Sequence, residues 1–128
     1  MSATARRRRP AVAVGHVFFA ATDVAAAGRW FRAVGLRPIA LDDDFAVLEL
    51  RGGTHLVVTK GRRKASPNRD APFDLMVDDI DAARRRFAAK GLKPTRIRRG
   101  TIHDSFRLAG PDGCVVSIVS SHAGDRAV

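Results

Sequence analysis

Three kinds of side chain in this sequence could do chemistry: one cysteine, four histidines and an excess of arginine. The cysteine, Cys114, cannot form an internal disulfide, and its apolar surroundings predict buried packing more than reactivity. A lone cysteine also suits a reducing compartment, so we expect a cytoplasmic protein. The formal net charge of +10 favours anionic or neutral partners over cationic ones.

The basic clusters could in principle contact nucleic acid. They lie at Arg6–Arg9, Arg62–Lys64, Arg84–Arg86 and Arg96–Arg99. No zinc-finger spacing or RNA-binding motif accompanies them, and the aromatic residues lie mostly in apolar stretches instead of alternating with the arginines. The clusters are more typical of solvated faces, so nucleic acid is not an expected partner. No uncharged apolar run approaches the roughly 20 residues that cross a bilayer, so no membrane partner is expected either.

The elements that must position these side chains come in two copies. Residues 23–38 and 79–94 match at a constant offset of 56, with nine identities in sixteen positions. Each copy starts at an aspartate that can cap a helix, has apolar residues at helical spacing, and ends at a glycine. A chain of 128 residues is too short for two independent cores. We therefore expect one domain with an internal duplication.

Around each helix the pattern predicts four strands, so the repeated unit is β-α-β-β-β. The expected strands are 16–21, 37–41, 45–50 and 55–60 in the first unit, and 73–78, 93–98, 103–109 and 114–120 in the second. The organisation that follows is a disordered basic tail at 1–11, a first module at 12–60, a linker at 61–71, a second module at 72–121 and a C-terminal tail at 122–128.

Four groups of residues carry a resemblance to a known family. They are Gly15-His16-Val17; Asp23-Val24 with Trp30-Phe31 and Gly35-Leu36; Val77 to Asp81; and Asp104-Ser105-Phe106 through Gly110-Pro111-Asp112-Gly113. In order and spacing they resemble the vicinal oxygen chelate superfamily, which includes glyoxalase I, extradiol dioxygenases, fosfomycin-resistance enzymes and bleomycin-resistance proteins. The resemblance covers about residues 12–120. It implies an α+β fold in which two tandem βαβββ modules form curved sheets around a cavity, with the helices outside.

Enzymes of this superfamily hold a divalent metal on four inward strand positions, and the resemblance places these positions at His16, Val57, Pro72 and Ser117. Valine and proline have no ligand atom, and a neutral serine hydroxyl is a poor ligand. Only His16 matches, so we expect no metal and no other cofactor. Without the metal, the usual reactions of the superfamily lose their main electrophile.

What remains is a cavity with apolar walls and a few polar points, which suits a small organic ligand. Strand alternation places His16 and Phe18 inward and Val17 and Phe19 under a helix. The expected ligand-binding residues are His16, Phe18, Phe45, Val47, Val57, Asp74, Met76, Ser105, Arg107 and Ser117.

The pattern resembles that of metal-free antibiotic-binding members of the superfamily. It indicates a protein that binds and sequesters a small, aromatic natural product or antibiotic and so confers drug resistance. The resemblance also implies a homodimer with sites at the interface, because many members of the superfamily pair in this way.

The alternative is an enzyme: either a lyase or dioxygenase with an unusual metal site, or a metal-free catalyst using His16 and Asp74 as an acid-base pair. An inward Asp74 is expected to pair with Arg107, with His16 or with the ligand.

Overall fold

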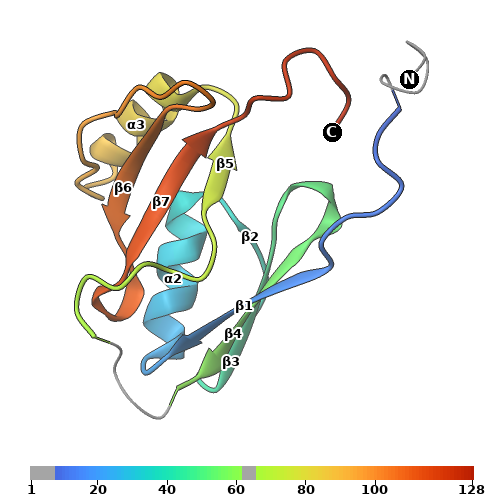
Figure 1. Ribbon diagram of the computed structural model, residues 1–128. Helices are drawn as coiled ribbons and strands as arrows, with labels where there is room; N and C mark the ends of the chain where they lie inside the picture. Colours follow the sequence, from blue (N-terminus) through green and yellow to red (C-terminus); the bar gives the residue numbers. More distant parts are fainter. Residues whose placement is uncertain (1–7, 62–65) are drawn as a thin grey trace.

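The structure, a computed structural model, describes residues 8–61 and 66–128 (Figure 1). Residues 1–7 of the expected tail and 62–65 of the expected linker, which include the cluster at 62–64, lie outside the described residues. The first module contains β1 (His16–Ala21), α2 (Val24–Val34), β2 (Arg37–Leu41), β3 (Phe45–Glu49) and β4 (His55–Lys60). The second contains β5 (Leu75–Val77), α3 (Ile80–Ala89), β6 (Ser105–Ala109) and β7 (Val115–Ser120).

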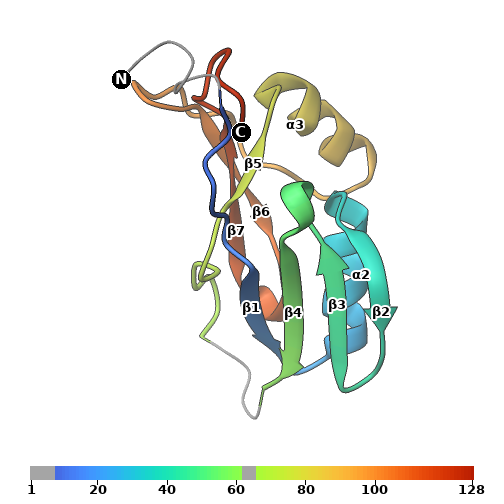
Figure 2. The ribbon, with the colours of Figure 1, turned by 90° about the vertical axis from the view of Figure 1, so that its right-hand side faces the viewer.

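The first module forms a four-stranded sheet in the order β1-β4-β3-β2, in which only β1 and β4 are parallel. Helix α2 lies behind this sheet in Figure 2. Alternation along β1 agrees with the prediction, because Phe19 is buried whereas Phe18 is 60% exposed. The helix begins where the Asp23 carboxylate accepts from the backbone N–H of Ala26 at 3.0 Å, and it ends at Gly35, whose φ of +120° suits glycine.

The second module has a three-stranded sheet in the order β5-β7-β6. The prediction of a strand at 93–98 is wrong, since this segment makes only an isolated bridge between Arg98 and Ser105 and a bond from Thr95 N–H to Arg107 O at 2.9 Å. Lys93 has a φ of +52°, a left-handed backbone conformation that does not fit a regular strand. The predicted α+β class of paired modules is nevertheless confirmed, with two helices and two sheets among the described residues.

The two modules share aromatic packing. Phe31 of α2 is fully buried and packs edge-to-face against Phe19, with ring centroids 5.5 Å apart. Phe73, which precedes β5, lies 6.1 Å from the same Phe31 ring. The core of the first module therefore continues into the second.

Cys114 is buried as predicted, and this burial raises the pKa of its thiol, so the thiolate is disfavoured.

Two polar contacts join the modules, one on each side. Thr22 donates its backbone N–H and its hydroxyl to the Asp112 carboxylate, at 2.8 and 2.9 Å. Arg51 donates twice to the Asp78 carboxylate, both at 3.0 Å. Thr22 and Asp78 each precede the N-cap of their helix, whereas Asp112 and Arg51 lie in the short turns η2 (Pro111–Gly113) and η1 (Arg51–Gly53). Each module thus binds the turn of the other through the residue before its helix cap.

We expect Asp112→Gly to lower the free energy of unfolding by about 1–3 kcal/mol, because the partly buried N–H of Thr22 loses its acceptor. Glycine avoids added strain, since Asp112 has a φ of +57°. Asp112→Asn is the matched control: its amide can accept from the Thr22 N–H and donate to the hydroxyl. Urea unfolding of both variants measures the loss of stability. An equal loss in Asp112→Gly and Asp112→Asn would contradict the role of residue 112 as the acceptor for the Thr22 N–H.

A second network lies on the outside of the second module. Arg99 contacts Asp81 of α3 at 2.8 Å and Asp104 at 2.9 Å, and it holds the pKa of both carboxyl groups below their usual range.

Among residues 8–61 and 66–128, no helix is both long and apolar enough to cross a membrane.

The Arg99 network predicts a pH-dependent stability. Because the folded-state pKa values of Asp81 and Asp104 are lowered, their contribution is present above the ordinary aspartate pKa of about 4 and is lost as the pH falls through the lowered values. We expect Arg99→Gln to melt below the wild type at pH 6, with the difference shrinking toward pH 2. Melting temperatures across that range measure it, and a difference independent of pH would contradict it.

Candidate functional site

Helix α2 covers only one face of the first sheet, and the other face is open (Figure 2). We call it the first open face; it carries His16, Phe18, Phe45, Val47 and Val57. Phe18 lies beside Val57 across β1 and β4, and Val57 lies beside Val47 across β4 and β3. Phe18 and Phe45 are 60% and 46% exposed, so two aromatic rings are available to a ligand.

The remaining predicted residues gather on the second sheet. The second open face carries Met76 of β5, Ser105 and Arg107 of β6, and Ser117 of β7, with Arg107 directly beside Ser117. Asp74 lies one residue before β5 and is exposed. The ten residues predicted to bind a ligand therefore fall into two groups, one on each sheet, and the sheets remain separate within the chain.

A polar row crosses the first sheet at one end of the open face. His16 pairs in register with His55, His55 with Glu49, and Glu49 with Arg37. The rings of His16 and His55 have centroids 5.9 Å apart, and Nε2 of His55 lies 3.3 Å from the Glu49 carboxylate, which also forms an ion pair with Arg37. The sequence analysis did not mark His55, because the resemblance placed the β4 metal position at Val57, two residues further along the strand. The parallel register of β1 and β4 identifies it.

The donor set does not fit the divalent metal of the superfamily. Val57 and Pro72 offer no ligand atom, and the Glu49 carboxylate already binds His55 and Arg37. Within the described parts of the chain, no three His, Cys, Asp or Glu side chains gather closely enough to hold a metal ion. The chemistry of this site must therefore be argued from the side chains that are present.

Arg107 has a different partner from those expected. Its guanidinium forms an ion pair with Asp70, which precedes the second module's first strand, and its backbone N–H donates to the Thr95 hydroxyl at 2.8 Å. Asp74 forms no hydrogen bond with His16 or Arg107 in the structure. An acid-base pair of His16 and Asp74 is thus not assembled, and the carboxylate that contacts an imidazole is Glu49.

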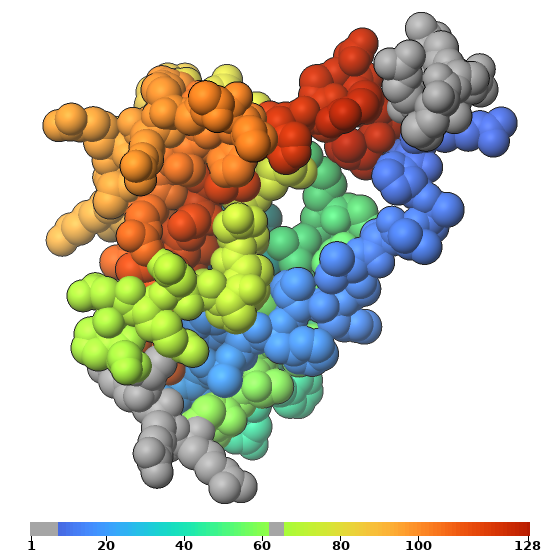
Figure 3. Space-filling view, viewed as in Figure 1, coloured from blue at the N-terminus to red at the C-terminus, as the bar shows by residue number. Residues whose placement is uncertain are grey.

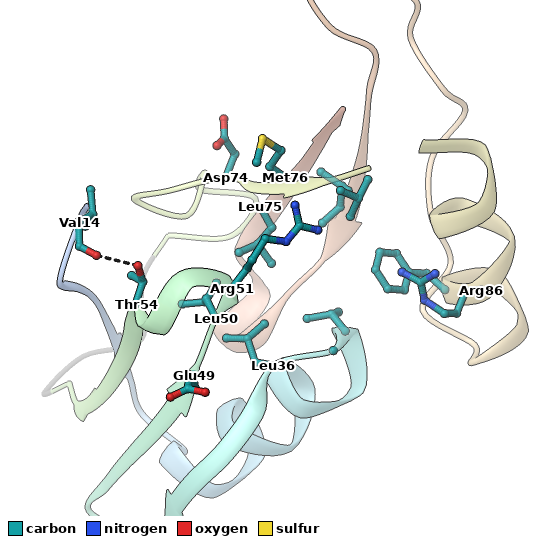
Figure 4. Close-up of a pocket in the computed structure, with 15 residues that line it drawn as sticks. Val14, Leu36, Glu49, Leu50, Arg51, Thr54, Asp74, Leu75, Met76 and Arg86 are labelled. Carbon is teal, nitrogen blue, oxygen red and sulfur yellow. Dashed lines mark hydrogen bonds between the residues drawn. The ribbon is translucent and has the colours of Figure 1, made fainter. Parts of the chain in front are cut away.

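A groove of about 580 Å³ lies between the two modules. Figure 3 shows it as a hollow between the yellow-green of β5 and the green of the η1 turn, and Figure 4 shows its lining. Leu36, Leu50 and Leu75 contribute apolar surface, while Arg51 and Arg86 enter from opposite sides. Asp74 and Met76, two of the predicted ligand-binding residues, also line this groove. The sequence did not predict the groove as a whole, because its residues come from both modules and meet only when the modules pack.

No protein-family model matches the sequence, and no curated protein matches it either. The fold does match solved structures. A lactoylglutathione lyase from Agrobacterium tumefaciens superposes with a TM-score of 0.70 at 20% identity, covering 91% of this chain and 98% of that one. The oxidase ChaP-H1 gives 0.67 at 23% identity, over 89% and 99%. A glyoxalase/bleomycin resistance protein/dioxygenase from Alicyclobacillus acidocaldarius gives 0.67 at 18% identity, over 88% and 94%.

The chain therefore has the fold of the glyoxalase/bleomycin resistance/dioxygenase proteins, and the resemblance to the vicinal oxygen chelate superfamily is confirmed at the level of the fold. These similar structures include a lyase, an oxidase and proteins named for resistance. Because one fold carries several activities, the function of this chain must be argued from its own side chains.

Proposed function

We propose that this protein is a metal-independent binding protein that sequesters a small aromatic natural product or antibiotic. The observation that carries the proposal is the uncovered aromatic surface of the first open face, with Phe18 60% and Phe45 46% exposed. Exposed aromatic side chains on a sheet face with few polar groups are typical of ligand sites, and two phenyl rings favour a planar, offset-stacked partner.

The protein acts as a homodimer. A second copy related by a twofold axis covers the first open face of one chain with the second open face of the other, which produces two equivalent sites. Apolar walls then come from Phe18 and Phe45, and hydrogen-bonding groups come from Ser105 and Arg107 of the partner copy. Met76, which is 45% exposed on the second open face, is covered at the same time. This arrangement supplies the cavity that the two separate faces lack in one chain.

A binding experiment tests the proposal. Purified protein is titrated with a panel of aromatic antibiotics by calorimetry, and the recovered compound is analysed by mass spectrometry. We expect tight binding of at least one compound, its recovery unchanged, and an affinity loss of about tenfold or more in Phe18→Ala. Val12→Ala is the control, because Val12 is 85% exposed and precedes both sheets. Chemical conversion of the compound, or equal loss in both variants, would contradict sequestration at this face.

A second candidate function is favoured by one observation, the contact of His55 with Glu49. A carboxylate beside an imidazole fixes the orientation of the ring, as a general base requires. Two of the similar structures are named a lyase and an oxidase, which is compatible with an enzyme function for this chain. On this hypothesis His55→Gln abolishes turnover of a bound compound while binding persists. Unchanged turnover in that variant would exclude His55 as the base.

A further inference from the structure

A pocket of about 460 Å³ opens on the second sheet beside β6. Its lining includes Arg96 and Arg98 from the segment that follows α3, together with Arg107 from β6. Ser105 and Ser117 add hydroxyl groups from the sheet itself. Three arginines and two serines therefore line one opening, on the face that carries four of the predicted ligand-binding residues.

The local backbone explains how two of these arginines reach the pocket. The segment is held along β6 by bonds between Arg98 and Ser105 in both directions, at 2.7 and 3.0 Å. An extended segment alternates its side chains, and Ile97 packs partly buried against the core. Arg96 and Arg98 therefore lie on the opposite side from Ile97, at the pocket. The incomplete fourth strand is thus the element that presents them.

The charges around the pocket are unbalanced. Asp70 is the single carboxylate in its lining, and it is paired with Arg107. Within residues 8–61 and 66–128, Arg96 and Arg98 have no carboxylate within ion-pair distance, whereas the adjacent Arg99 is held by both Asp81 and Asp104. Nearby acids thus neutralise Arg99 and leave the two pocket arginines available. Like charges held together in a concave site favour an anion between them.

The geometry points to an oxyanion-binding subsite here: Arg96 and Arg98, beside the ion-paired Arg107 and with the hydroxyl of Ser117, bind a carboxylate or a phosphate-type group of the ligand. Guanidinium groups are planar donors that bind such oxygens in a bidentate manner. This inference rests on the proposed function and narrows its ligand to an aromatic acid.

The test compares three small probes of similar shape at constant ionic strength: benzoate, phenylphosphonate and the neutral benzamide. The full chain is labelled with ¹⁵N, and the side-chain Nε–H and backbone signals are followed by NMR. We expect both anions to shift the signals of Arg96 and Arg98, and benzamide to leave them in place. Whichever anion binds more tightly identifies a carboxylate or a phosphate-type group as the preferred one.

Arg98→Gln should weaken binding of the preferred anion by about tenfold or more. Arg29→Gln is the matched control, because it removes the same charge from an exposed position on α2. Equal weakening in both variants, or benzamide binding as tightly as benzoate, would overturn the inference. Failure of the proposed function has a different signature: Phe18→Ala leaves aromatic affinity unchanged, whereas the arginine signals still respond to the anions.

Discussion

Phe31→Ala is expected to lower the free energy of unfolding by about 3–5 kcal/mol. The Phe31 side chain is fully buried, and its ring packs against Phe19, Trp30 and Phe73. These neighbours belong to a strand, a helix and the segment before β5, so the cavity left by the ring cannot collapse by moving one element. The loss should therefore lie toward the upper end of core truncations.

Urea unfolding followed by Trp30 fluorescence and by circular dichroism measures this effect. Because Phe73 belongs to the second module, both probes should report one transition, in which the modules unfold together. Arg32→Ala, an exposed substitution on the same helix, should change stability by less than about 0.5 kcal/mol. A loss below 1 kcal/mol for Phe31→Ala, or two separate transitions in the wild type, would show that the modules do not share a core.

Phe18→Lys is expected to convert the proposed homodimer into monomers, raising the dissociation constant by about 1000-fold. A central aromatic residue of an interface is worth about 2 kcal/mol or more, and a twofold interface contains it twice. The added ammonium groups would also lie between apolar faces without a partner. The fold itself should persist, because Phe18 points away from α2 and makes no contribution to the buried core.

Light scattering across a range of protein concentrations measures the dimer, and circular dichroism verifies the fold. Ile102→Lys is the control, since Ile102 is 69% exposed in the loop before β6, outside both open faces. A wild-type protein that remains monomeric at micromolar concentrations would contradict the dimer. A Phe18→Lys protein that remains dimeric would place the interface elsewhere.

Local signals in the sequence predicted most of the fold correctly. Asp23 and Asp79 cap their helices as expected, because capping depends on residues three positions away. Alternation along β1 predicted which side chains face α2, since the period of a strand is a local property. The strand at 93–98 failed for a reason that the sequence does not show. Pro38, at the same position of the first copy, lies within β2, so the difference is the φ of +52° at Lys93.

The site was less predictable than the fold. His55 lies beside His16 only through the register of two parallel strands, and that register depends on how the intervening helix α2 and strands β2 and β3 pack. The pairing of Arg107 with Asp70 joins residues 37 positions apart. Arg96 and Arg98 were visible in the sequence as part of a basic run. That Arg99 is ion-paired, and that Arg96 and Arg98 are not within the part of the chain that the structure describes, could be seen only once the structure showed which aspartates lie beside Arg99.

The contacts of Thr22 with Asp112 and of Arg51 with Asp78 also determine which halves can associate. If two first modules packed in the same way, Gly52 would stand at the position of Asp112, and the Thr22 N–H would have no side-chain acceptor. If two second modules did so, Pro111 would stand at the position of Arg51, and the Asp78 carboxylate would lose its donor. Unlike halves alone satisfy both contacts, so divergence after the duplication has made the halves non-interchangeable: the chain behaves as a heterodimer within one polypeptide.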